Sequence, residues 1–97
     1  MTAQIWNKSW WVEETREKVL DTALDTLVRR AGFKVLDTLE HEFKPFGYTK
    51  LWLLAESHLA VHTFPEEGKA YVEISSCNVD FFDAFVVGMD KMFKGVG

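Results

Sequence analysis

The residues best suited to chemistry lie close together in the second half of the chain. The segment Glu56-Ser57-His58 combines a carboxylate, a hydroxyl nucleophile and an imidazole, a second imidazole follows at His62, and the chain's only thiol is Cys77. Imidazoles titrate in the range needed to move protons near neutral pH. A thiol with an ordinary pKa of about 8.5 is mostly protonated there, yet it can give up its proton. These residue types indicate acid–base chemistry around Ser57.

The order of these residues resembles that of the prokaryotic S-adenosylmethionine decarboxylase family. The shared pattern is Glu-Ser-His, a histidine five residues after the serine, Pro65-Glu66 at eight and nine, and a cysteine at twenty. The resemblance is close over residues 43–77 and extends loosely, through the order of elements, over 15–93. It implies that the chain cuts itself between Glu56 and Ser57, giving a β-chain of residues 1–56 and an α-chain of residues 57–97.

The resemblance also implies a role for each matching residue. Ser57 becomes a pyruvoyl group, which forms a Schiff base with the substrate amine and accepts the electron pair released when carbon dioxide leaves. His62 matches the histidine assigned to processing. Cys77 matches the cysteine that returns a proton to the substrate α-carbon. Thr49 lies where the family commonly has a serine that assists the acyl shift, so its hydroxyl is retained.

Two further residues match positions that bind substrate in the family. S-adenosylmethionine carries a sulfonium charge, a flat adenine and a ribose diol, so its pocket needs aromatic faces and a carboxylate. The resemblance implies that Phe43 lies near the adenine and that Glu66 holds the ribose. It also implies a homodimer with sites built across the interface. The product is then the aminopropyl donor for spermidine synthesis.

Each of these residues also has an ordinary structural explanation. A lone serine commonly occupies a turn, and a lone cysteine is commonly a buried apolar residue. Phe43 can belong to the core, and Glu66 can be a solvated hairpin acid. His58 and His62, four residues apart on a strand, would share one face and can suggest a metal pair. No Cys-x-x-Cys or His-Glu-x-x-His motif supports a metal, so we predict none and leave the role of His58 open.

Two other functions fit the same motif. The first is pyruvoyl chemistry on arginine or ornithine, for which Glu40, Glu42 and Glu67 offer acidic partners. The second is an uncut, non-catalytic homologue that binds a ligand or a partner. Two features depart from the family pattern: residues 6–13 lack its histidine-led pattern, and the sequence ends at Gly97, where typical members continue into another strand.

The composition is typical of one small globular domain over residues 1–97. Hydrophobic residues make up 47% of the chain and aromatic residues 14%, enough for a single core. The formal charge of −4 argues against binding nucleic acid. One cysteine cannot form an intramolecular disulfide, which favours a reducing compartment. No signal-like segment and no apolar run of about 18 residues is present, so we expect a soluble, cytoplasmic protein without membrane contact.

Periodicity and breakers predict the elements that must position these residues. Apolar positions at helical spacing predict a helix over 13–30, capped by Gly32, and a last helix capped by Asp80. Strands are expected at 10–12 (an edge strand), 33–43 (half-buried), 51–55, 59–64 and 71–76, with a turn at Pro45–Gly47 and a hairpin connection over 65–68. The strand at 51–55 leads directly into Glu56-Ser57. Short loops favour antiparallel pairing, so the order β-α-β-β-β-β-α predicts a two-layer α/β sandwich, with two helices on one face of a mainly antiparallel sheet.

Overall fold

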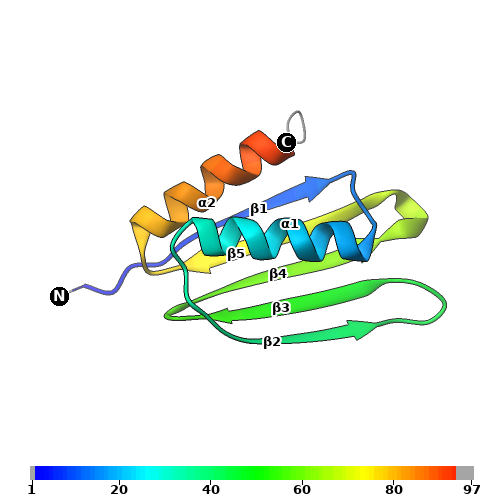
Figure 1. Ribbon diagram of the computed structural model, residues 1–97, viewed down its shortest axis with the longest axis horizontal. Helices are drawn as coiled ribbons and strands as arrows, with labels where there is room; N and C mark the ends of the chain where they lie inside the picture. The colour runs from blue at the N-terminus through cyan, green and yellow to red at the C-terminus, as the bar shows by residue number, and fades with distance from the viewer. Residues whose placement is uncertain (1, 94–97) are drawn as a thin grey trace.

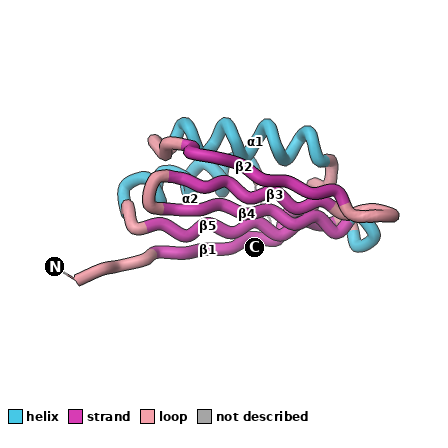
Figure 2. The backbone as a smooth tube through the Cα atoms, turned by 90° about the horizontal axis from the view of Figure 1, so that it is seen from below, coloured by secondary structure: helices cyan, strands magenta, loops and turns pink. Residues whose placement is uncertain are grey.

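A five-stranded antiparallel sheet with two helices on one face forms the protein (Figure 1). The computed structural model describes residues 2–93, so the chain end at Gly97 lies outside the described residues. The strand order is β1-β5-β4-β3-β2, with β1 and β2 at the two edges (Figure 2). The predicted two-layer sandwich and the predicted edge strand near residues 10–12 are confirmed. The elements are β1 (Trp6–Val12), α1 (Glu17–Arg30), β2 (Val35–Glu42), β3 (Tyr48–Leu54), β4 (Ser57–Phe64), the short 3-10 turn η1 (Pro65–Glu67), β5 (Lys69–Ser76) and α2 (Val79–Met92).

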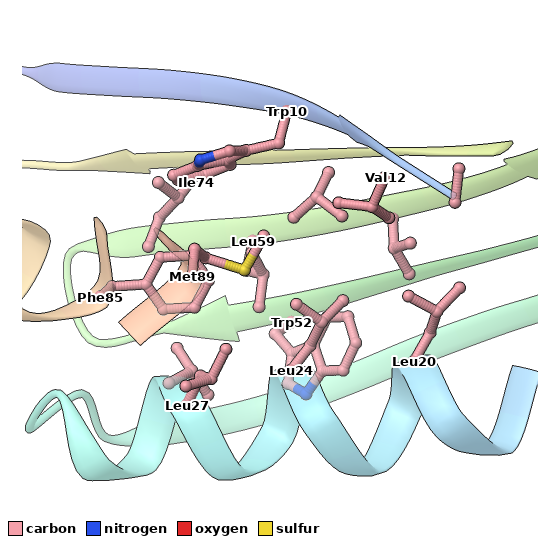
Figure 3. Packing of buried hydrophobic residues seen from close by; sticks show 14 of the residues in the cluster. Trp10, Val12, Leu20, Leu24, Leu27, Trp52, Leu59, Ile74, Phe85 and Met89 are labelled. Atoms are coloured by element: carbon pink, nitrogen blue, oxygen red, sulfur yellow. The ribbon is translucent and has the colours of Figure 1, made fainter. Parts of the chain in front are cut away.

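The core lies between the helices and the inner strands of the sheet. Leu20, Leu24 and Leu27 point from α1 toward the sheet, and Phe85 and Met89 of α2 lie beside them (Figure 3). Every second residue of the inner strands meets these side chains, because successive side chains of a strand point to opposite faces. The buried residues of these strands include Trp52, Leu54, Leu59, Val61, Ala70, Val72 and Ile74. Burying one large apolar side chain contributes roughly 1.5–3 kcal/mol.

The helix predicted over 13–30 begins four residues later, at Glu17. The carboxylate of Glu14 accepts the backbone N–H groups of Thr15 and Arg16, which fixes a short loop before the helix. The predicted end is confirmed. The N–H of Gly32 bonds to the carbonyl of Arg29, and the next N–H bonds back to Val28, the pattern of a Schellman cap. Gly32 has a φ of 110°, which explains the glycine at this position.

Two predictions, one about β2 and one about α2, are wrong. The second strand was expected to be half-buried, but all of β2 except Val35 is exposed. It is an edge strand whose helix-facing residues are the polar Thr38 and Glu40, so it has little apolar surface to bury. The cap of α2 is Asn78 rather than Asp80, because the Asn78 side chain accepts the N–H of Phe81.

Two tight connections set the register of the strands that carry the motif. Only Ala55 and Glu56 separate β3 from β4, and η1 with Gly68 joins β4 to β5. The second connection confirms the predicted hairpin and places Ser57 directly opposite Ser76. Across residues 2–93, no helix has the length and apolar character needed to cross a membrane.

Candidate active site

The residue before Ser57 has a strained backbone. Glu56 has a φ of 63°, and it is the one described residue other than glycine with a positive φ. A side chain in the left-handed region costs on the order of 1–3 kcal/mol and persists only where its surroundings impose the conformation. Here the two-residue turn between paired strands imposes it. The strain therefore lies next to the bond that the sequence predicts to be cut.

The thiol of Cys77 contacts both oxygen-bearing groups of Glu56. Its Sγ lies 3.1 Å from the Glu56 carbonyl oxygen and 3.3 Å from Oε2 of the side chain. The hydrogen bond to the Glu56 carboxylate is the main reason that the pKa of Cys77 is raised above its usual value, and burial adds to it. The thiol is thus held protonated, with its hydrogen directed at Glu56.

The hydroxyl of Ser57 lies on the helix-facing side of β4 and is buried. Its Oγ donates to Oγ of the fully buried Ser76 at 2.8 Å. Sequence reasoning missed Ser76 as a neighbour of Ser57. Counting back along both strands from the connection at residues 65–68 places the two serines opposite each other, so the hairpin held a usable signal.

The other four predicted site residues gather at the opposite end of the sheet. Thr49, on β3, places its Oγ1 2.9 Å from Nδ1 of His62 on β4. Phe43 and Glu66 border the same cavity, which has a volume of about 290 Å³. The cavity is lined by Phe43, Phe46, Gly47, Thr49, His62, Thr63, Phe64 and Glu66.

The two groups do not meet within one chain. Ser57 is the first residue of β4 and His62 the sixth, a separation of about 16 Å along an extended strand. Their side chains also point to opposite faces, since Ser57 shares its face with the buried Leu59 and Val61. One chain therefore carries the Glu56–Ser57 bond, which is predicted to be cut, with the Cys77 thiol at one end of the sheet and the histidine with the aromatic cavity at the other.

Comparison with known proteins decides the family. A family model described as S-adenosylmethionine decarboxylase matches residues 13–94. The chain belongs to this S-adenosylmethionine decarboxylase family. The resemblance carried by Glu-Ser-His and the spacing to Cys77 is thereby confirmed.

Similar proteins in the S-adenosylmethionine decarboxylase family are known from several bacteria. The chain is 48% identical over 61 residues to the S-adenosylmethionine decarboxylase proenzyme of Prochlorococcus marinus (strain MIT 9313), covering 63% of this chain and 49% of that protein. It is 35% identical over 85 residues to the proenzyme of Persephonella marina (strain DSM 14350 / EX-H1), covering 88% of this chain and 53% of that protein. The chain spans about half the length of the curated relatives it matches.

A solved structure shows the same fold. The adenosylmethionine decarboxylase from Aquifex aeolicus VF5 aligns with the whole of this chain and 88% of its own, with a TM-score of 0.72. The sequence identity is 20%, so this likeness establishes the fold alone. The order of strands and helices that the family resemblance implied is confirmed.

In this family member, the sheet face turned away from the helices is apolar over β2 and β3. Leu39 is 71% exposed and Leu53 is 54% exposed, and Leu51 lies between them, paired with Leu39 on one side and Ala60 on the other. His62 and the aromatic cavity open on this same face. A patch of exposed leucines beside a site is typical of a surface that another molecule covers.

The two histidines of β4 cannot share a metal ion. His58 and His62 do lie on one face, as expected, but four residues along a strand separate them by about 13 Å. That distance far exceeds the span of two ligands on one ion, whose bonds are about 2 Å each. Among residues 2–93, no group of three or more metal-binding side chains is present.

Proposed function

We propose that this chain is a self-processing, pyruvoyl-dependent decarboxylase of S-adenosylmethionine, giving the decarboxylated aminopropyl donor for spermidine synthesis. The observation that carries the proposal is the contact of the Cys77 thiol with the carbonyl oxygen of Glu56, 3.1 Å away, next to Ser57. Membership of the S-adenosylmethionine decarboxylase family supports the substrate. The same membership favours this substrate over arginine and ornithine.

The first step joins Ser57 to Glu56 through an ester. The Ser57 hydroxyl attacks the Glu56 carbonyl carbon, the carbon–nitrogen bond of the peptide breaks, and the hydroxyl proton ends on the freed nitrogen. Negative charge develops on the carbonyl oxygen in the transition state. The Cys77 thiol donates a hydrogen bond to that oxygen. The left-handed backbone of Glu56 raises the energy of the starting peptide.

The second step cuts the chain. A base removes the α-proton of residue 57, the bond between Cβ and Oγ breaks, and the oxygen leaves as part of the Glu56 carboxylate. Addition of water and loss of ammonia then leave the pyruvoyl group. We assign the base to His62, in the tautomer whose Nδ1–H donates to Thr49 Oγ1, so that the lone pair of Nε2 takes the proton.

This base must come from a second copy of the chain. His62 is about 16 Å from Ser57 along its own strand and faces the other side of the sheet. The exposed leucines Leu39, Leu51 and Leu53 support a homodimer that places one copy's histidine beside the other copy's serine. Each active site then combines Ser57 and Cys77 of one protomer with Thr49 and His62 of its partner.

The residues around position 57 fit a pyruvoyl group. The group would stand at the start of β4, with the Cys77 thiol beside the same turn. It supplies the electron sink that loss of carbon dioxide requires. Cys77 then delivers a proton to the substrate α-carbon. Its raised pKa keeps the thiol protonated near neutral pH, so that it has a proton to donate.

The cavity at the other end of the sheet is suited to the rest of the substrate. Phe43, Phe46 and Phe64 offer aromatic surfaces for adenine, and Glu66 offers a carboxylate for the two ribose hydroxyls. Phe43 is half exposed, so part of its ring surface can contact a ligand. The free thiol of Cys77 supports a reducing, cytoplasmic location.

Intact-mass measurement tests the proposal directly. The purified protein is expected to give two fragments that divide after Glu56, the second beginning with a pyruvoyl group. Ser57→Ala is the matched control and should remain whole. A wild-type protein that stays a single 11.2 kDa species under active conditions contradicts the proposal. Release of carbon dioxide from S-adenosylmethionine, but not from arginine or ornithine, then tests the substrate.

A further inference from the structure

We propose that Ser76 is a positioning residue for self-cleavage, holding the Ser57 hydroxyl in the orientation needed to attack Glu56. This inference rests on the proposed function, because it concerns the first step of the same cleavage. Ser76 lies one residue before Cys77 and has none of the roles that the family motif implied.

The position of Ser76 is fixed from several sides. It is fully buried at the end of β5, where it pairs with Ser57 of β4 on one side and with Trp6 of β1 on the other. The next residues enter α2, whose N-terminal cap is Asn78. A side chain held by two neighbouring strands and a helix start has little freedom to move.

The hydrogen bonds of Ser76 determine the direction of the Ser57 hydroxyl. Ser76 Oγ accepts the N–H of Asn78 at 2.9 Å and donates its own hydrogen to the Asn78 carbonyl at 3.2 Å. A serine hydroxyl has one hydrogen and two lone pairs. The bonds to Asn78 use the hydrogen of Ser76 and one of its lone pairs. Ser76 can therefore only accept a hydrogen bond from Ser57, which agrees with the 2.8 Å contact in which Ser57 is the donor.

This arrangement prepares Ser57 for attack. The hydrogen of the Ser57 hydroxyl points to Ser76, which leaves the lone pairs of Ser57 Oγ free for the carbonyl carbon of Glu56. Ser76 also gives the hydroxyl a buried polar partner in a site that holds few others. Without the Ser76 hydroxyl, Ser57 can rotate to other rotamers, and correctly oriented nucleophiles become rarer.

The test compares Ser76→Ala, Ser76→Thr and Ser76→Val, with Ser75→Ala as the control. Thr and Val have nearly the same shape, but only Thr keeps the hydroxyl. Ser75 is the preceding residue on β5 and points to the other face of the sheet. The rate of fragment formation is followed by intact mass, and thermal unfolding identifies variants that fold.

We expect Ser76→Ala and Ser76→Val to cleave about 10- to 100-fold more slowly than wild type, since a misoriented reacting group costs rates of this order. Ser76→Thr should recover most of the wild-type rate, and Ser75→Ala should match wild type. If Ser76→Ala does not fold, the Thr and Val pair decides the question.

Hydroxylamine identifies the step that is affected, because it cuts esters and leaves amides intact. Ser76→Val should remain resistant to hydroxylamine, since it is slowed before the ester forms. An ester that accumulates in Ser76→Val, or Val and Thr variants that cleave at equal rates, would overturn the inference. A wild-type chain that never cuts instead refutes the proposed function itself, and this inference with it.

Discussion

Ser57 and His62 occupy the same strand but opposite faces of it, about 16 Å apart. Both are predicted to act on the Glu56–Ser57 bond, and a single chain cannot bring them together. The hydrogen bond between His62 and Thr49 and the contact of Cys77 with Glu56 mark two halves of the proposed site. In the proposed dimer, each site takes one half from each protomer.

Mixed dimers test this arrangement. Ser57→Ala and His62→Ala proteins should each remain uncut when prepared alone. When the two are expressed together with different tags, cleavage should return, and only in the His62→Ala chains, which keep the serine and receive the partner's histidine. Mass analysis of each tagged chain checks this. If the co-expressed variants remain uncut while wild-type protein cleaves, the shared site is contradicted.

Replacing His62 should stop processing after the first step. Without its base, His62→Ala is expected to accumulate the ester between Glu56 and Ser57, because acyl shift precedes removal of the α-proton. Hydroxylamine should then cut the chain at residue 56. Thr49→Val is the companion variant: it keeps the shape of threonine and removes the hydroxyl that orients His62, so it should slow elimination less severely. If His62→Ala cleaves itself at the wild-type rate, His62 is not the base.

Replacing Cys77 should affect both cleavage and turnover. The sulfur contacts the carbonyl that Ser57 is proposed to attack, so Cys77→Ala should lower the cleavage rate by about 10-fold or more. A thiol is a weak donor, so this loss should be smaller than the roughly 100- to 1000-fold seen when one oxyanion-hole donor is removed. The fraction that does cleave should release carbon dioxide poorly, for want of a proton donor. Cys77→Ser, which keeps a donor, should cleave faster than Cys77→Ala. Full turnover by Cys77→Ala would refute the proton-donor role.

The pKa of Cys77 predicts its reactivity with alkylating agents. The Glu56 carboxylate raises this pKa, so at pH 8 the thiolate fraction should be smaller than that of an ordinary cysteine. In the uncut Ser57→Ala background, alkylation should therefore be slow and should accelerate as the pH rises above 9. Adding Glu56→Gln removes the negative charge and should shift the alkylation profile to lower pH. An unchanged profile contradicts the assigned cause.

Asn78 should matter more to stability than Asp80. Asn78→Ala removes the side-chain cap of α2 and is expected to lower the free energy of unfolding by about 0.5–2 kcal/mol. Asp80→Ala removes only an exposed acid in the first helical turn, whose interaction with the helix dipole contributes about 0.3–1 kcal/mol. Urea unfolding of the two variants in the uncut Ser57→Ala background measures the difference. A larger loss in Asp80→Ala would restore Asp80 as the cap.

Much of the fold could be predicted because the relevant signals are local. Helical spacing of apolar residues, glycine at the end of α1 and the Pro65–Gly68 connection each depend on residues close in the chain. The exposure of β2 could not be predicted, because its alternating pattern does not reveal that it lies at an edge of the sheet, with a neighbouring strand on one side alone. Choosing Asn78 over Asp80 as the cap required the hydrogen bond to Phe81.

The sequence by itself determined the family and the bond expected to cut, because the order and spacing of Glu56-Ser57, His62 and Cys77 are properties of the chain alone. Only the tertiary structure decided which of these residues are neighbours. Antiparallel pairing brings Cys77 and Ser76 to the Glu56-Ser57 turn across about twenty residues. The same extended strand that joins Ser57 to His62 keeps them apart, because each residue adds about 3.3 Å and reverses the face.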